Sequence, residues 1–374
     1  MKIITNQLGL LLIFLLVTAC NGTTGFNQSG TPSGNSGSTS AGGKLTVYFT
    51  QPDAANATTL TGGPETHLIA AMDKAQISID MAIYELSLKN VTQSLIRAHQ
   101  RGVNVRVYTD TDHFAWAEFK KLVKAGIALK GDKRSALMHN KFTVIDKKQV
   151  WTGSMNYTYN GAYHHNENLL RLDSIEAALN YSEEFAQLWR GIHRQINTSD
   201  SVFTVDGTTV KVYFSPDDGF RKNYLLPLLA SAKQSVHFMA FAFTSRDIAN
   251  SLSNLKQQGI EIKGVFDKNQ SGQSYSQYDD LLKLNVDVKL DGNPYKLHHK
   301  VMIIDHRYVV TGSYNFTQNA ENNNDENALI IDSKNLANIY EKEFSKVYQQ
   351  ANNRQARSIN NEILYDKSDW MTAY

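Results

Sequence analysis

One long segment of the sequence occurs twice, and this repeat constrains the fold more than any other feature. Residues 139–170 read HNKFTVIDKKQVWTGSMNYTYNGAYHHNENLL, and residues 298–330 read HHKVMIIDHRYVVTGSYNFTQNAENNNDENALI. Among the positions that recur with a constant displacement of 159 are eight pairs of glycine or polar residues. A duplicated fold under selection for packing alone keeps its apolar pattern while its polar residues drift. The repeated polar residues therefore indicate shared chemistry. The eight pairs are His139/His298, Lys141/Lys300, Asp146/Asp305, Gly153/Gly312, Ser154/Ser313, Asn156/Asn315, Thr158/Thr317 and Glu167/Glu326.

The flanking segments repeat as well, as strands that alternate with amphipathic helices. Ser87 and Ser245 are predicted to cap the helix after the long apolar strand of each half, and Gly102 and Gly259 to close that helix. This alternation predicts α/β layering with a largely parallel or mixed sheet in each half. The predicted strands are 44–49, 77–86, 103–110, 210–214, 236–245 and 260–267, and the predicted closing helices are 174–192 and 333–351.

Length and composition divide the chain further. With 374 residues and 41% hydrophobic residues, the chain is long enough for two domains with substantial cores. Its net charge of +2 does not by itself require a nucleic acid or an anionic lipid as partner. The expected folded units are a first domain at 44–195, a linker at 196–209, a second domain at 210–352 and a tail at 353–374.

The N-terminal residues are typical of an exported lipoprotein. Ten mostly apolar residues, Leu8 to Val17, are too few to span a bilayer comfortably. The following Thr18-Ala19-Cys20 resembles the bacterial lipobox, in which the cysteine is lipidated, and Cys20 is the single cysteine of the chain. Residues 1–20 are therefore expected to be a lipoprotein signal peptide. Residues 21–43, rich in Gly, Ser, Thr and Asn, are expected to be a disordered tether that reaches roughly 25 Å. This places the protein in a bacterial cell envelope, anchored to a membrane on its periplasmic or extracytoplasmic side.

The repeated residues suit the binding of an anion. His139 and Lys141 alternate along a predicted strand, so an imidazole and an ammonium group project from the same face. Gly153 and Ser154 allow a close backbone approach, and Asn156 adds an amide donor. Such donors stabilise a group whose negative charge rises during a reaction, and phosphate is the natural candidate.

The repeated carboxylates fall into two kinds. Asp146 and Asp305 each begin a turn and point away from the His and Lys in a regular strand, which favours a structural or supporting role. Glu167 and Glu326 begin the next strand, where a carboxylate could orient an imidazole and fix its tautomer.

Both segments resemble the HKD signature of the phospholipase D superfamily, HxKx4D followed by GSxN and a later Glu. The resemblance extends over both halves, nearly all of residues 44 to 350. It implies two similar α/β/α sandwich halves, with mixed sheets, that are packed about a pseudo-twofold axis and share one site. It also implies a monomer, because both motifs lie in one chain, and chemistry that needs no cofactor and no metal.

The resemblance also implies roles for the repeated residues. One histidine attacks phosphorus to give a phosphohistidine, and the other protonates the leaving oxygen and later activates water. Most two-motif members imply His139 as the nucleophile, although the symmetry of the sequence leaves His298 open. The HKD residues implied as catalytic are His139, Lys141, Asp146, His298, Lys300 and Asp305; the phosphate ligands are Asn156, Asn315, Ser154 and Ser313; the supporting residues are Glu167 and Glu326.

Several substrates stay open on the sequence alone. A phospholipid headgroup is favoured by the expected anchor on Cys20. A metal-independent endonuclease of the cell envelope is the alternative, because the second motif looks like the compact bacterial nuclease branch. An inactive phosphate- or lipid-binding module and a phosphatidyl transferase come third. His164, His165 and His306 are interpreted as loop histidines without metal, and His299 as a packing residue that faces away from the site.

Overall fold

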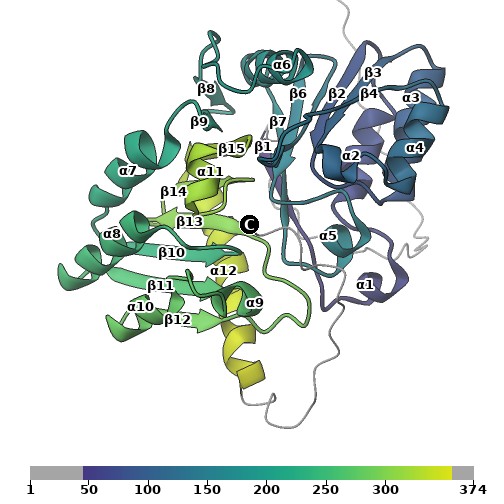
Figure 1. Ribbon diagram of the computed structural model, residues 1–374. Coiled ribbons are helices and arrows are strands. Elements are labelled where there is room, and N and C mark those ends of the chain that lie inside the picture. Colours follow the sequence, from purple (N-terminus) through teal and green to yellow (C-terminus); the bar gives the residue numbers. More distant parts are fainter. Residues whose placement is uncertain (1–44, 356–374) are drawn as a thin grey trace, which may run out of the picture. The chain divides into compact units, whose positions relative to one another are not determined.

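Two mixed β-sheets form the framework of the protein in the computed structural model, which describes residues 45–355 (Figure 1). The first sheet has seven strands in the order β1-β7-β6-β5-β2-β3-β4, and the second has eight in the order β12-β11-β10-β13-β14-β15-β9-β8. In each sheet three parallel strands adjoin a set of antiparallel strands, which confirms the predicted duplicated α/β fold with mixed sheets. The predicted signal peptide, Cys20, the tether and the tail beyond residue 355 lie outside the described residues.

The elements keep the same order in both halves. The strands of the first sheet are β1 (Leu45–Phe49), β2 (Ser78–Ile83), β3 (Asn104–Thr109), β4 (Ala128–Gly131), β5 (Lys141–Ile145), β6 (Gln149–Gly153) and β7 (Asn168–Asp173). Those of the second are β8 (Val202–Val205), β9 (Thr208–Ser215), β10 (Ser235–Ala240), β11 (Glu261–Phe266), β12 (Asp287–Leu290), β13 (Lys300–Ile304), β14 (Tyr308–Gly312) and β15 (Glu326–Asp332). The helices are α1 (Ala55–Thr59), α2 (Glu65–Met72), α3 (Lys89–Gln100), α4 (Ala117–Lys124), α5 (Tyr159–Tyr163), α6 (Ile175–Trp189), α7 (Leu226–Ala230), α8 (Arg246–Gln257), α9 (Lys268–Ser271), α10 (Tyr278–Lys283), α11 (Gln318–Asn322) and α12 (Lys334–Gln355).

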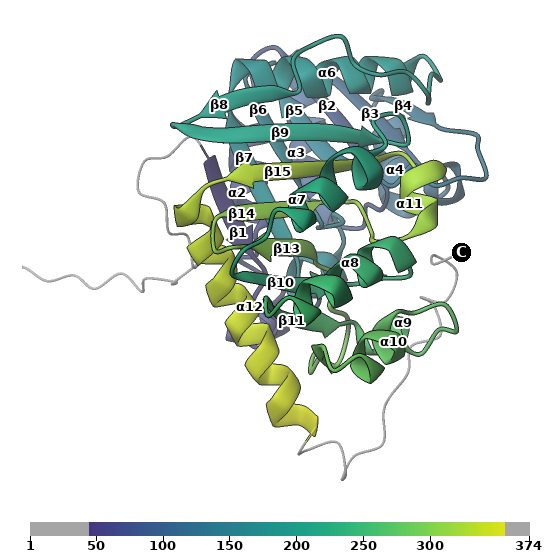
Figure 2. The ribbon, with the colours of Figure 1, turned by 90° about the vertical axis from the view of Figure 1, so that its left-hand side faces the viewer.

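Helices cover both faces of each sheet, as the fully buried strands β2 and β10 require. In the first half α2, α3 and α4 pack with the sheet in one apolar core, and in the second half α7, α8 and α10 do the same. The long helices α6 and α12 cover the other faces, and Figure 2 shows α12 crossing the strands of the second sheet. Their apolar residues join strands from both halves in one shared core, so the two sheets are held together by burial of apolar surface.

Some local predictions differ from the structure. The prediction that Ser87 caps α3 was wrong, because Leu88 occupies the N-cap and the Ser87 hydroxyl accepts a hydrogen bond from the backbone N–H of Tyr159 instead. Ser245 caps α8 as predicted. The segment 196–209, expected to be a linker, contains β8, which extends the second sheet beside β9. None of the helices within residues 45–355 combines the length and apolar character needed to cross a bilayer.

Candidate active site

The two histidines of the repeated motifs lie where the chain segments before β5 and β13 cross into the other half. The backbone N–H of His139 donates to the carbonyl of Asp325 at 3.0 Å, and that of His298 donates to the carbonyl of Asn166 at 3.1 Å. Isolated parallel bridges, Met138 with Asp325 and Asn166 with Leu297, accompany these bonds. Each histidine is therefore anchored to the segment that leads into the glutamate strand of the opposite half.

The glutamates are exchanged between the halves. Nδ1 of His139 lies 2.9 and 2.8 Å from the two carboxylate oxygens of Glu326, and Nδ1 of His298 lies 2.6 Å from Oε1 of Glu167. Both carboxylates are fully buried and both imidazoles nearly so. A carboxylate at Nδ1 fixes the tautomer and the ring orientation, so Nε2 is the nitrogen that each ring offers to a substrate. The sequence predicted imidazole-orienting glutamates but not their exchange between halves.

The two lysines occupy matching positions beside the histidines. Nζ of Lys141 donates to the carbonyl of His139, and Nζ of Lys300 to the carbonyl of His298, each at 2.7 Å. Each ammonium group also lies over an aromatic ring, at 5.2 Å from the ring centre of Tyr84 in the first half and at 4.9 Å from that of Phe241 in the second. Both side chains are buried, so the chain places two fixed cations in one low-dielectric site, which suits a phosphate.

The Gly-Ser pair that follows β6 and β14 has a steric reason in each half. Gly153 and Gly312 adopt φ angles of 142° and 134°, and a Cβ at either position would collide with the carbonyl oxygen of Asn168 or Asn327. This close approach lets the next serine reach the glutamate strand: the Ser313 hydroxyl donates to Oε2 of Glu326 at 2.6 Å. Glycine is therefore required for the packing that holds the histidine-binding carboxylate in place.

Ser154 and Asn156, two of the remaining predicted phosphate ligands, contact residues beside the same site. The Ser154 hydroxyl accepts from the backbone N–H of Asn168 at 3.1 Å, and Nδ2 of Asn156 donates to Oε2 of Glu85 at 2.8 Å. Asn315, the counterpart of Asn156, is half-buried. A carboxylate only accepts hydrogen bonds, so the contact with Glu85 fixes which end of the Asn156 amide carries the nitrogen.

Two asparagines that the sequence reasoning missed connect the halves. Nδ2 of Asn327 donates to Oδ1 of Asn140 at 2.9 Å, and Nδ2 of Asn168 lies 3.0 Å from Nδ1 of His299. His299, predicted as a packing residue, is fully buried at this junction and also contacts a polar side chain of the other half. Asn168 and Asn327 are also displaced by 159, which is the signal that could have identified them.

Burial sets the electrostatics of the site. It lowers the pKa of the His139 and His298 imidazoles well below the ordinary value, and the ammonium groups of Lys141 and Lys300 lower the pKa of both further. Burial also lowers the pKa of Lys141 to about 8 and raises the pKa of each paired glutamate to about 8. Because each ammonium group acts on both imidazoles, the two motifs form one electrostatic unit.

The surroundings of the two histidines are not equivalent. Near His139, Nε2 of His113 lies 3.9 Å from Oε1 of Glu85, and the Lys141 ammonium feels the Glu85 charge. Near His298, the His165 ring lies 6.0 Å away, and the Lys296 ammonium lowers the pKa of His298. The first side is thus more acidic and the second more basic, a difference that a search for repeated residues could not find.

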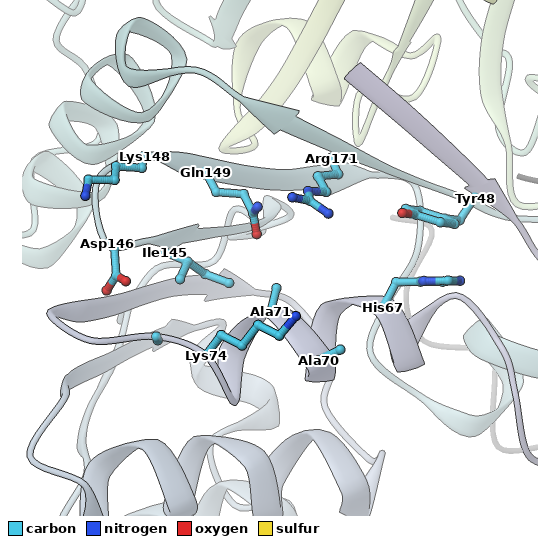
Figure 3. A pocket seen from close by; sticks show the side chains of 11 residues that line it. Tyr48, His67, Ala70, Ala71, Lys74, Ile145, Asp146, Lys148, Gln149 and Arg171 are labelled. Carbon is cyan, nitrogen blue, oxygen red and sulfur yellow. The ribbon is translucent and has the colours of Figure 1, made fainter. Parts of the chain in front are cut away.

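The two aspartates of the motif lie away from this site. Asp146 and Asp305 follow the far ends of β5 and β13, where their carboxylates accept hydrogen bonds from three successive backbone N–H groups, those of residues 76–78 and 233–235 respectively. Figure 3 shows Asp146 at one end of a surface pocket that also includes Arg171 and His67 and none of the motif histidines or lysines. The structure therefore joins both His-Lys pairs, the serines, Asn156 and the glutamates, and leaves the aspartates outside.

Comparison with known proteins relates this arrangement to a family. A family model described as "Cardiolipin synthase, PLD-like domain" matches twice, at residues 68–189 and 225–348. The phospholipase D of Rickettsia prowazekii is 30% identical over 140 residues, which cover 37% of this chain and 68% of the relative. The mitochondrial cardiolipin hydrolase of Xenopus tropicalis is 34% identical over 127 residues, which cover 33% of this chain and only 60% of the relative. The phosphatidylserine synthase structure from Haemophilus influenzae Rd KW20 matches with a TM-score of 0.59 at 13% identity, over 82% of this chain and 86% of that one, which shows a common fold.

Proposed function

The chain belongs to the PLD-like domain family, with one such domain in each half, and from this premise we propose that it is a phosphodiesterase of phospholipase D type that hydrolyses a phospholipid headgroup. The exchanged pairs, His139 with Glu326 and His298 with Glu167, are the observation that carries this proposal. They supply two oriented imidazoles to one site, as a two-step displacement at phosphorus requires.

In the proposed first step, Nε2 of one histidine attacks phosphorus and forms an N–P bond while the bond from phosphorus to the leaving oxygen breaks. The other imidazole, in its protonated form, gives its proton to that oxygen. In the second step the same imidazole removes a proton from water, the resulting hydroxide attacks phosphorus, and the N–P bond breaks. The family resemblance favours His139 as the nucleophile and His298 as the acid and base. Lys141 and Lys300 bind the non-bridging oxygens throughout.

The electrostatics support these proton movements. Because burial and two ammonium groups disfavour a charged imidazole, Nε2 of the nucleophile is unprotonated in the free enzyme. A bound phosphodiester adds a negative charge beside the lysines and favours the protonated form of the second imidazole. Substrate binding thus helps to create the acid that the first step consumes.

Several features support a phospholipid as the substrate. The two relatives named above are a phospholipase D and a cardiolipin hydrolase. The proposed lipid anchor on Cys20 would hold the enzyme in the bacterial cell envelope, within a tether length of membrane lipids. The net charge of +2 gives little general attraction for a nucleic acid. Because one chain carries both motifs, the proposed enzyme acts as a monomer. The family resemblance implies that its catalysis needs no metal.

The test uses the purified full-length protein with EDTA and, in parallel, a fluorescent phospholipid in vesicles and plasmid DNA. Phospholipid cleavage is expected, and His139→Ala and His298→Ala should each lower kcat at least about 10³-fold. His99→Ala, a histidine of α3 outside the site, is the matched control and should keep full activity.

The other outcomes distinguish the alternatives. Cleavage of plasmid alone would identify an endonuclease, and transfer of the phosphatidyl group to an added alcohol without hydrolysis would identify a transferase. A lack of turnover on both substrates, with phosphate still bound, would identify an inactive binding module. Full activity in either folded alanine variant would contradict a site shared by the two histidines.

A further inference from the structure

A second group of histidines and a carboxylate lies at the end of β10 that is remote from the active site. His237 belongs to β10, His306 to the turn between β13 and β14, and Glu341 to α12. Nδ1 of His237 lies 2.7 Å from Oε2 of Glu341, and Nδ1 of His306 lies 2.9 Å from Oε1 of the same carboxylate. One ligand atom from each residue falls within 4.8 Å of the other two. Two imidazole nitrogens therefore lie against the two oxygens of one carboxylate.

The second nitrogen of each ring is also bound. Nε2 of His237 lies 2.9 Å from Oε1 of Glu261, and the other oxygen of that carboxylate accepts from Nζ of Lys263 at 2.8 Å. Nε2 of His306 lies 3.3 Å from the Ser235 hydroxyl. Metal-binding histidines typically use their second ring nitrogen in this way, because a carboxylate there orients the ring and makes the ligating nitrogen more basic.

The fold itself does not require this cluster, as the first half shows. Strand register places Asp80 of β2 where β10 has His237, and Asp80 pairs with Arg106 at 2.7 Å. The displacement of 159 places Lys147 and Ser182 at the positions of His306 and Glu341. Among the residues that the structure describes, no other group of three such side chains meets the same spacing. The second half thus carries a feature that its duplicate lacks.

We propose that His237, His306 and Glu341 bind a divalent transition metal ion of the zinc type. Two imidazoles with one carboxylate are a common donor set for Zn²⁺, and a water molecule would complete a tetrahedron. Ligand atoms at zinc distances lie about 3.3 Å apart, so the contacts of 2.7 and 2.9 Å with the two Glu341 oxygens would lengthen by about half an ångström. One nitrogen of each ring, now within 4.8 Å of the other, would settle at the same separation. His306 is 48% exposed, which gives the ion access from solvent, whereas His237 is 8% exposed and held in place.

The position of this site points to a structural role. His237 lies near the start of β10, and the strand ends at Ala240, just before Phe241, which packs on the catalytic His298. At roughly 3.3 Å per residue the metal would lie more than about 10 Å from the reacting phosphorus. It would connect α12 to β10 and to the β13–β14 turn, and would stabilise the second half. The proposal is independent of the phosphodiesterase proposal, since activity in EDTA and metal binding are measured separately.

The experiment titrates the untagged full-length protein, freed of metal by chelation, with Co²⁺ as a spectroscopic substitute for Zn²⁺. Wild-type protein is expected to bind one Co²⁺ with the intense visible bands of four-coordinate cobalt, and one equivalent of Zn²⁺ should remove those bands. His306→Ala and Glu341→Gln should abolish the bands, and Glu261→Gln should weaken the affinity about 10–100-fold. His99→Ala is the control for loss of a histidine elsewhere and should bind as the wild type does.

The wild-type titration decides the proposal even if a variant fails to fold. Absence of one tightly bound Co²⁺ in wild-type protein would overturn it, as would unchanged bands in a folded His306→Ala protein. Zn²⁺ should also raise the unfolding temperature of the wild type and leave that of Glu341→Gln unchanged. An equal rise in both proteins would place the ion elsewhere and refute the assignment.

Discussion

Replacement of Glu326 by glutamine tests whether a carboxylate of one half controls the histidine of the other. Oε2 of Glu326 accepts from the Ser313 hydroxyl, and both carboxylate oxygens lie within 2.9 Å of Nδ1 of His139. In glutamine one of these two oxygens becomes an amide NH₂ group, which cannot accept a hydrogen bond from Nδ1–H of His139. The substitution also removes the negative charge that balances the imidazole when Nε2 bonds phosphorus.

The structure indicates the size of the effect. The pair is buried, with no exposed surface on Glu326, so the charge of the reacting imidazole would lose its partner in a low-dielectric environment. Removing one member of a buried ion pair costs about 3–5 kcal/mol. If the transition state bears this whole cost, kcat falls roughly 10²- to 10⁴-fold. KM should change little, because Glu326 has no exposed surface to offer a substrate.

The assay is steady-state hydrolysis of the fluorescent phospholipid across a range of pH. A carboxylate stabilises the imidazolium form, so its loss lowers the pKa of His139 further, and the acidic limb of the kcat/KM profile should move to lower pH. Glu343→Gln is the matched control, because this buried carboxylate lies 3.7 Å from His299 and contacts neither catalytic histidine. Activity of Glu326→Gln within about threefold of the control, or an unmoved acidic limb, would refute the exchanged pairing.

Three further predictions follow from the geometry of the site and its supports. Gly312→Ala should lower the free energy of unfolding, measured by urea titration, by about 3 kcal/mol, because the added Cβ would collide with the carbonyl of Asn327. Gly259→Ala is the control, since its Cβ would enter open space, and should lower the free energy of unfolding by only about 1 kcal/mol. Burial lowers the pKa of Lys141 to about 8, so kcat/KM should fall above about pH 8 as the cation that binds phosphate is lost, and an unchanged value at pH 9.5 would contradict this role. Asp305→Ala should lower the urea midpoint, because the lost hydrogen bonds from backbone N–H groups reduce the free energy of unfolding by about 1.5–3 kcal/mol. It should leave kcat within about twofold of wild type. A large fall in kcat in the folded variant would show that the aspartate takes part in catalysis.

The fold could be predicted from the sequence because the signals for strands and helices lie in short segments, and because they occur in both halves. Alternating strands and helices determine the layers, and the repeat determines that both halves share them. Local signals failed where tertiary contacts decide the outcome. Ser87 has the side chain of a typical helix cap, yet the backbone N–H groups of Ser87 and Leu88 both donate to the carbonyl of Tyr157. Helix α3 therefore begins one residue later than a cap at Ser87 would predict.

The partners of the catalytic histidines could not be predicted from the repeat. His139 and Glu167 lie in the same motif, so a pair within each half and a pair exchanged between halves produce the same sequence pattern. The contacts of Asp325 and Asn166 with the opposite half decide between these arrangements, and they depend on how the two sheets dock. Glu85 could not be found from the repeat either, because the second half has no equivalent carboxylate. A search for repeated residues detects only those that occur in both halves.

The exchange of glutamates explains why the polar residues of the duplicate have been retained together. In a site where each half completed its own histidine, one copy could lose its glutamate and leave the other intact. Here the loss of Glu167 affects His298, and the loss of Glu326 affects His139, so a substitution of either glutamate acts on the motif histidine of the other half. Asn168 and Asn327 extend this dependence to the side chain that follows each motif histidine, His299 and Asn140 respectively. Neither half alone can orient its own histidine, so both glutamates are needed to complete one site.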